Sequence, residues 1–207
     1  MERMAMSQGG IIWLATCCLA AWSSCSGQEV LEVDAEQRFP ATAVVSIPLA
    51  RLVDSLGASA RDVSFLVDKS DRTFTVLVKK EVVKVYPCVL GEAPVGDKYY
   101  QGDRRTPEGS FTFRGKRVHG AWHKFIWVDY PNEESWRRFR ERQAMGAIPA
   151  GKDIGGEIGI HGVPVGKDHW ITQGVDWTWG CIALRNADVD EIYPYIVPNR
   201  TMMEVRP

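Results

Sequence analysis

A histidine and a cysteine towards the C-terminal end of the chain have the types and spacing of a catalytic pair. His161 ends an apolar run, and Cys181 follows it within the motif Thr-Trp-Gly-Cys. A cysteine attacks a carbonyl as its thiolate, and because a free thiol is mostly protonated at neutral pH, it needs a base nearby. His161 can accept that proton and return it to a leaving amine. The pair predicts covalent acyl-transfer chemistry if the fold brings the two together; otherwise they are a loop histidine and a buried cysteine.

Small and polar residues beside the pair suggest how a substrate would be held. Gly162 and Gly180 have no side chain, so a substrate backbone can approach them closely. The backbone amides of Gly180 and Cys181 can point at a developing oxyanion. The hydroxyl of Thr178 can orient either His161 or the substrate. We therefore expect an oxyanion site at the Cys181 turn.

A metal centre is the alternative use of these side chains, with His161, His169 and Cys181 as ligands. Their spacing matches no common zinc pattern, and the chain has no Cys-x-x-Cys pair. We therefore predict neither a metal nor a cofactor.

The first 25 residues are typical of an export signal. Residues 11–22 form an uncharged apolar stretch, shorter than the ~20 residues that cross a bilayer. Ser23 and Ser24 then precede Cys25, as in a bacterial lipoprotein signal, which predicts a protein of the cell envelope with either a lipid anchor at Cys25 or plain cleavage. A buried N-terminal helix is disfavoured because residues 23–28 break the apolar pattern at once.

The chain beyond this leader has only two cysteines, Cys88 and Cys181. A disulfide scaffold would use more. Cys88 lies in the strand-like run VYPCVL, which predicts a buried and inert thiol. We therefore expect Cys181 to be the reactive one and no bridge between the two.

Composition excludes several classes of protein. The chain has 207 residues, 45% of them apolar, and a net charge of -1 with no run of Lys or Arg, so no nucleic-acid partner is expected. Nineteen Gly and 11 Pro exclude a long helical bundle. A single globular domain made of many short elements is the expectation, acting as a monomer.

The pattern along the chain predicts a mainly β fold. Apolar runs in residues 63–67, 73–78 and 81–90 are separated by polar turns, which indicates a meander of strands. Further strands are expected at 110–113, 123–129, 155–161, 177–184 and 202–205. Helices are expected at 48–57, at 132–144 and after residue 186, with Asn132 and Asn186 as their N-caps.

These elements imply a β-sandwich or flattened barrel with two or three short helices. Three parts of the chain follow: a leader (1–25), a tether with a short helix (26–62) and a catalytic domain (63–207). The stretch 91–109 is rich in Gly and charge, which predicts a mobile flap over the site.

The motif around Cys181 resembles the signature of the L,D-transpeptidase (YkuD-type) catalytic domain. In that family a His-Gly is followed, after some fourteen to seventeen residues, by Ser/Thr-x-Gly-Cys. Sixteen residues separate His161 from Thr178 here, with Gly180 and Cys181 in register. The run VYPCVLG and the turn Thr-Pro-Glu-Gly at 106–109 are similar to family features upstream.

The resemblance implies a β-sandwich-like enzyme that acts on peptidoglycan stem peptides. In such enzymes the cysteine attacks the third residue of a tetrapeptide stem, expels D-Ala and passes the acyl group to an amine. Many members have Arg two residues after the cysteine, whereas this chain has Ala183 there and Arg185 two further on. Arg185 is therefore expected to grip stem carboxylates. Trp179 stands where His is frequent, which suggests a stacking surface.

Two other functions remain open at this point. A hydrolase on the same scaffold would use water as the acceptor, either trimming stems as an L,D-carboxypeptidase or releasing wall-linked protein. A non-catalytic wall-binding module is a third reading, which the complete His/Gly/Thr/Gly/Cys set disfavours.

Overall fold

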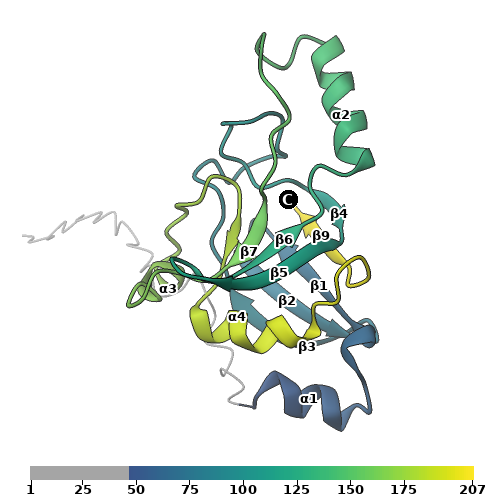
Figure 1. Ribbon diagram of the computed structural model, residues 1–207, viewed down its shortest axis with the longest axis vertical. Coiled ribbons are helices and arrows are strands. Elements are labelled where there is room, and N and C mark those ends of the chain that lie inside the picture. Colours follow the sequence, from purple (N-terminus) through teal and green to yellow (C-terminus); the bar gives the residue numbers. More distant parts are fainter. Residues whose placement is uncertain (1–46) are drawn as a thin grey trace, which may run out of the picture. The chain divides into compact units, whose positions relative to one another are not determined.

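The computed structural model describes residues 47–207. This part of the chain folds into two β-sheets with short helices around them (Figure 1). One sheet has the strand order β3-β2-β1-β9-β4 and the other has the order β5-β6-β7-β8. The predicted mainly β, sandwich-like fold is therefore confirmed. The strands are β1 (Val63–Asp68), β2 (Thr73–Val78), β3 (Glu81–Pro87), β4 (Gly109–Phe111), β5 (Phe113–His119), β6 (His123–Val128), β7 (Gly159–His161), β8 (Ile182–Ala183) and β9 (Met203–Arg206).

The predicted meander is the larger part of the first sheet. β1 pairs with β2 and β2 with β3, both antiparallel, and β9 then joins β1 in parallel. Alternate residues face inwards, as the period of a strand requires. Phe74, Val76 and Val78 are buried on one face of β2, as their spacing predicts.

The second sheet contains a strand that the sequence pattern does not reveal. β5 pairs antiparallel with β6 and lies at the edge of its sheet. Its sequence, FRGKRVH, has a glycine and four charged or imidazole side chains and no alternation of apolar residues. Alternation is not needed here, because neither face of β5 is buried beyond Phe113 at its start.

The structure has four α-helices between residues 47 and 207, one more than predicted. The predicted three are α1 (Leu49–Ser55), α2 (Glu133–Ala144) and α4 (Asn186–Ile192), and the extra one is the single turn α3 (His169–Thr172). Asn132 caps α2 as expected, since its side chain accepts from the amide of Ser135 at 3.0 Å.

The predicted cap of α4 is wrong. Asn186 is the first residue inside the helix, and Arg185 occupies the N-cap position without a capping hydrogen bond. The Asn186 side-chain oxygen instead accepts from the amide of Val163 at 2.9 Å. The residue is therefore used to join α4 to the segment that follows β7.

The main core lies between the two sheets. The rings of Phe65 and Phe113, one from each sheet, have centroids 6.1 Å apart, and Ile126 and Ile160 are fully buried beside them. Leu49 and Val53 of α1 belong to the same core, so the folded unit begins upstream of β1. The predicted leader and Cys25 lie outside the described residues. Within the described part no helix is long and apolar enough to cross a membrane.

Candidate active site

The two predicted catalytic residues come from neighbouring strands. His161 ends β7, Cys181 directly precedes β8, and the two strands are parallel with His161 opposite Ala183. Residues two apart on a strand share a face, so Cys181 faces the same side as His161, with Cα atoms roughly 8 Å apart for ideal strand spacing. Both side chains line one cavity of about 910 Å³. Pairing of β7 with β8 therefore brings together two residues that are distant in sequence.

His161 is held as a neutral base. Its Nδ1 donates to the carbonyl of Gly162 at 2.7 Å, which leaves the lone pair on Nε2 free to accept a proton. The ring is 2% exposed and stacks on Trp122 at a centroid distance of 5.0 Å. This burial disfavours the charged imidazolium and lowers the pKa of His161 to about 4.

Cys181 rests as a thiol. Its Sγ donates to the backbone carbonyl of Glu157 at 3.6 Å, and burial raises the pKa of Cys181 to about 11. Glu157 has a φ of 56°, which is unusual for a residue with a side chain, and this conformation presents its carbonyl to the sulfur. The resting pair of Cys181 and His161 is therefore neutral, with the thiol proton directed at the Glu157 carbonyl.

Thr178 and Gly180 build the turn that carries Cys181. The Thr178 hydroxyl donates to the Cys181 carbonyl at 2.7 Å and accepts from the Gly180 amide at 3.2 Å. Thr178 lines the cavity, but its hydrogen bonds are made within the turn and none is to His161. The Gly180 amide that was expected to face an oxyanion is thus engaged by Thr178.

The glycines at the site are required by the protein's own packing. Gly180 has a φ of 127°, and a Cβ there would lie 2.7 Å from the carbonyl oxygen of Arg105. A Cβ on Gly162 would lie 2.1 Å from the side-chain oxygen of Asn186. The groups that approach these glycines closely are therefore parts of the protein itself and not a substrate backbone as expected. Neither glycine lines the cavity.

Of the two remaining residues expected to contact substrate, Trp179 lines the cavity and Arg185 does not. Trp179 is 75% exposed at the cavity, with the guanidinium of Arg104 5.4 Å from its ring centroid. Arg185 does not line the cavity, and it forms an ion pair with Asp188 at 2.6 Å.

The cavity also has a set of lining residues that sequence reasoning missed. Most come from the β5–β6 hairpin and from residues 155–158, which carry no recognisable motif. They supply an aromatic wall and several hydrogen-bonding groups. These residues are Arg117, His119, Trp122, Phe125, Trp127 and Glu157. Trp177 also lines it, and its indole N–H is buried without a partner among the described residues.

Cys88 is confirmed as a buried residue. It is 0% exposed, and burial raises the pKa of its thiol far above the usual range. Cys88 and Cys181 are both free thiols. Only Cys181 opens to the cavity, so it is the one thiol among residues 47–207 that a substrate could reach.

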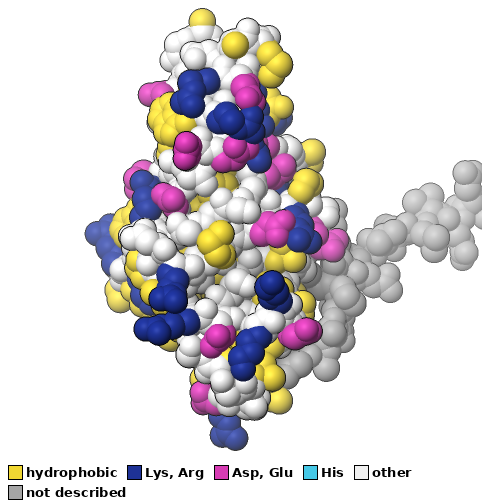
Figure 2. All heavy atoms as spheres, turned by 90° about the vertical axis from the view of Figure 1, so that its right-hand side faces the viewer, with side chains coloured by type: hydrophobic (Ala, Val, Ile, Leu, Met, Phe, Trp, Pro, Cys, Tyr) yellow, Lys and Arg dark blue, Asp and Glu magenta, His cyan; other side chains and the backbone are white. Residues whose placement is uncertain are grey.

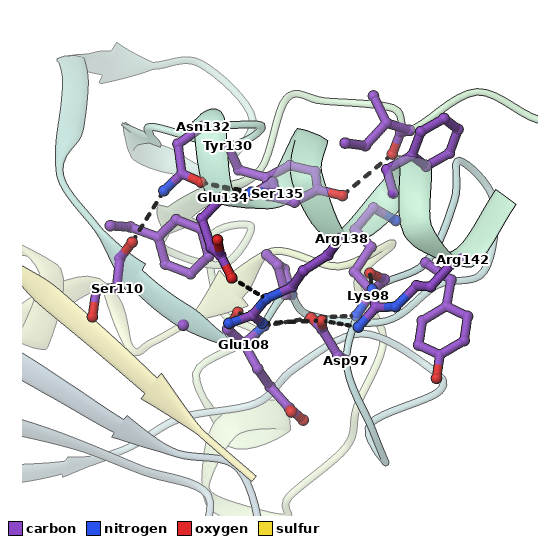
Figure 3. Close-up of a pocket in the computed structure, with 16 residues that line it drawn as sticks. Asp97, Lys98, Glu108, Ser110, Tyr130, Asn132, Glu134, Ser135, Arg138 and Arg142 are labelled. Carbon is purple, nitrogen blue, oxygen red and sulfur yellow. Dashed lines mark hydrogen bonds and ion pairs between the residues drawn. The ribbon is translucent and has the colours of Figure 1, made fainter. Parts of the chain in front are cut away.

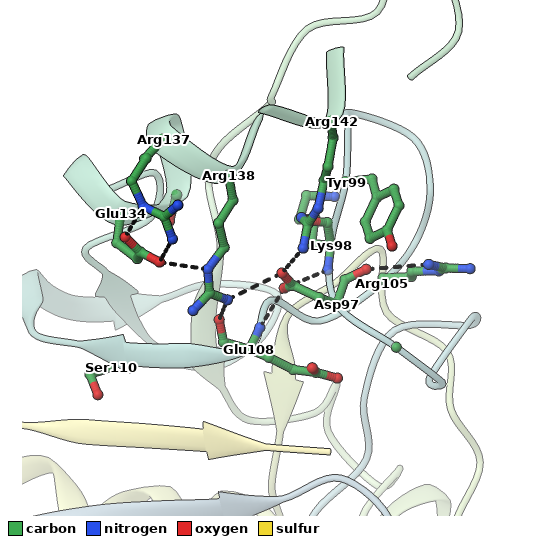
Figure 4. Close-up of polar contacts among 12 residues, drawn as sticks. Asp97, Lys98, Tyr99, Arg105, Glu108, Ser110, Glu134, Arg137, Arg138 and Arg142 are labelled. Atoms are coloured by element: carbon green, nitrogen blue, oxygen red, sulfur yellow. Dashed lines mark hydrogen bonds and ion pairs between the residues drawn. The ribbon is translucent and has the colours of Figure 1, made fainter. Parts of the chain in front are cut away.

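The loop 91–109, predicted to be a mobile flap because it is rich in Gly and charge, has most of its charged side chains in ion pairs. Asp97 lies under α2 and receives Arg142 at 2.6 Å and Arg138 at 3.4 Å (Figures 3 and 4). Its other carboxylate oxygen accepts from the backbone amides of Lys98 and Glu108. Asp97 therefore attaches this loop to α2.

Helix α2 carries charges of both signs on its outer face as well. Arg137 contacts Glu134 and Glu141 at 2.5 Å, and in the space-filling view positive and negative side chains alternate over this helix (Figure 2). All of these side chains are about half exposed, where such pairs contribute little to stability. The inner pairs to Asp97 are the ones that position the loop beside the cavity.

Removing Asp97 is expected to release the loop. Asp97→Ala leaves Arg142 and two backbone amides without their acceptor, which should lower the free energy of unfolding by about 2–3 kcal/mol. In limited proteolysis, the Asp97→Ala protein should be cut within residues 91–109 faster than the native protein. Glu141→Gln, which breaks an exposed pair on the same helix, is the control and should cost less than about 0.5 kcal/mol. Equal effects of the two substitutions would contradict this role of Asp97.

The sequence comparison places the chain in a family. Residues 62–205 match the family described as YkuD, L,D-transpeptidase catalytic domain. The match covers more than half of the chain and includes both His161 and Cys181. The protein belongs to the L,D-transpeptidase catalytic domain family. A comparison with curated proteins found no match.

The solved structures that match this chain share little sequence with it. Bd1075 of Bdellovibrio bacteriovorus is 21% identical with a TM-score of 0.49, and the match covers 70% of this chain and 48% of that one. An L,D-transpeptidase from Mycobacterium smegmatis is 19% identical (TM-score 0.45, 70% and 59% covered). The helical cell shape determining protein Pgp2 from Campylobacter jejuni is 20% identical (TM-score 0.48, 76% and 55% covered). The chain thus spans about half the length of these proteins.

Proposed function

We propose that this protein is a peptidoglycan L,D-transpeptidase with Cys181 as its nucleophile. The substrate would be a tetrapeptide stem, bound with the carbonyl of its third residue beside the Cys181 sulfur. The family to which the chain belongs supports an enzyme acting on peptidoglycan. The reaction needs no metal or cofactor, because the thioester conserves the energy of the peptide bond that is cleaved.

The first half of the proposed reaction forms the acyl-enzyme. His161 takes the thiol proton as the Cys181 sulfur bonds to the stem carbonyl carbon. The tetrahedral intermediate then collapses, the C–N bond to the terminal D-Ala breaks, and His161 gives the proton to the leaving amine. A neutral His161 with a free Nε2 is in the correct state to begin this sequence.

The second half transfers the acyl group. An acceptor amine on another stem attacks the thioester carbon, the C–S bond breaks, and a proton from the amine returns to Cys181 through His161. The products are a 3→3 cross-link and the free enzyme. If a protein amine is the acceptor, the product is an attached protein.

One observation carries the proposal: Cys181 and His161 open from adjoining strands into the same cavity. At about 910 Å³ it lies at the upper end of the range for ligand pockets, so it can hold a peptide. Incubating the purified protein with sacculi and analysing the muropeptides tests it directly. New dimers are expected, and they should be absent with Cys181→Ala. Shortened stems or released protein would indicate a hydrolase, and an unchanged profile would indicate a wall-binding module.

We also propose that the protein is exported and that its mature form begins near Cys25. The support is the short apolar stretch followed by Ser23-Ser24-Cys25. Intact-mass analysis of protein from the envelope fraction should give a chain that starts near residue 25. A diacylglyceryl adduct would establish the lipid anchor, and full-length chain recovered from the cytosol would contradict export.

A further inference from the structure

The candidate active-site cavity has one cationic side chain without an acidic partner. Lys98 is buried and pairs with Asp103 at 2.7 Å, while Arg104 pairs with Glu92 at the cavity rim. Arg117 also lines the cavity and has no carboxylate within ion-pair distance in the described part of the chain. Its charge is therefore available to a ligand.

Arg117 is held in place by an aromatic ring. Its guanidinium lies 5.2 Å from the ring centroid of Trp127, diagonally across the β5–β6 hairpin. The Trp127 indole N–H donates in turn to the Glu157 carboxylate at 2.9 Å, which fixes the ring. Stacking occupies the flat face of a guanidinium and leaves its N–H edge free. The side chain is thus pre-oriented at low entropic cost, although it is exposed.

A second donor lies two residues further along the same strand. His119 shares the cavity-facing side of β5 with Arg117, since residues two apart on a strand face one way. Its Nδ1 accepts from the backbone amides of Ala121 and Trp122, both at 3.2 Å. The neutral ring therefore carries its proton on Nε2, where it acts as a donor. Its stack on Trp122, with centroids 4.7 Å apart, holds this orientation.

We propose that Arg117 and His119 form a receptor for a carboxylate of the peptide stem, and so select which stems reach Cys181. A guanidinium edge matches the two oxygens of a carboxylate, and a neighbouring N–H adds a further bond to one of them. Arg185, the residue that sequence reasoning assigned to this task, is already paired outside the cavity. The identity of the ligand as a peptidoglycan stem rests on the proposed function; the chemistry of the receptor does not.

Binding to an inactive variant tests the receptor apart from catalysis. The full-length Cys181→Ala protein would be titrated with a synthetic tetrapeptide stem that has free side carboxyls, and with the same peptide in which they are amidated. Arg117→Gln in this background should weaken binding of the free acid by about 10- to 100-fold, the range for a charge-assisted hydrogen bond. His119→Asn, which keeps an acceptor for the hairpin turn, should weaken it about 5-fold.

The amidated peptide supplies the decisive comparison. It should bind the Cys181→Ala protein weakly, and Arg117→Gln should leave its affinity unchanged. Arg140→Gln, which removes an equal charge from α2 outside the cavity, is the matched control and should change neither affinity. The proposed receptor would be contradicted if Arg117→Gln weakened binding of both peptides equally or of neither. It would also be contradicted if the free acid did not bind the Cys181→Ala protein. Selective binding combined with no acyl-enzyme in the native protein would overturn the proposed function instead.

Discussion

Cys181→Ala is expected to abolish covalent labelling and to lower turnover by at least about 10⁴-fold, because no other group can form the thioester. The sulfur faces the cavity from the turn before β8, and the Nε2 lone pair of His161 is free in the same cavity. A carbapenem, whose strained lactam is an acyl donor, should add once to the native protein. Peptide mapping by mass spectrometry should place the adduct on Cys181.

Cys88→Ala is the matched control for this experiment. Its thiol is fully buried in the main core, so the substitution should cost about 1 kcal/mol of stability and leave both the adduct and turnover nearly intact. An adduct on Cys88, or activity on sacculi that survives in Cys181→Ala, would disprove the covalent mechanism.

His161→Gln is expected to slow acylation by about 10²–10⁴-fold, the usual contribution of a positioned base. Glutamine keeps most of the side-chain volume beside Trp122, and its amide can still donate to the Gly162 carbonyl. It cannot accept the thiol proton as imidazole does. Single-turnover acylation by a carbapenem, followed by mass spectrometry, measures the effect on this step alone.

The pH dependence of acylation separates a base from a merely structural residue. In the native protein the imidazole has a pKa of about 4, so it is neutral above about pH 5, and the rate should be nearly flat from there to pH 9. In His161→Gln the thiolate must form unaided, and the pKa of Cys181 is about 11. Its rate should therefore rise about tenfold per pH unit over the same range. A uniform loss at every pH would mean that His161 only supports the fold.

The meander could be predicted, and Cys181 and His161 could be singled out as candidates, because each depends on a local pattern. β1, β2 and β3 are runs rich in β-branched and aromatic residues that are bounded by polar turns. Cys181 is recognisable because the residues around it form a short and specific motif. The helix at α2 was predictable for the same reason, since Asn132 and two glutamates mark its start.

The prediction missed β5, and the reason is its position at the edge of a sheet. No residue of β5 beyond Phe113 is buried, so both faces carry charged residues without a penalty and FRGKRVH has no signature that distinguishes it from a loop. Its strand character comes from pairing with β6. The same pairing turns Arg117 and His119 towards the cavity.

The roles of several predicted residues depended on hydrogen-bond and ion-pair partners that the sequence pattern does not indicate. Thr178 and Gly180 belong to the motif, but which hydrogen bonds they make was decided by the turn geometry. The guanidinium of Arg185 is suited to bind a substrate carboxylate, but it already forms an ion pair with Asp188. The ion pairs of Asp97 could not be predicted, because its partners Arg138 and Arg142 lie more than 40 residues downstream of it.

The sequence by itself determined the reactive groups and the elements that carry them, because nucleophile, base and strand period are properties of residues and their near neighbours. Only the tertiary structure decided the state of those groups and what surrounds them. Burial makes His161 a neutral base and Cys181 a protonated thiol. Packing of β5 and β6 beside β7 builds the cavity wall. Desolvation and ion pairing depend on atoms contributed from across the whole fold, and no local pattern encodes them.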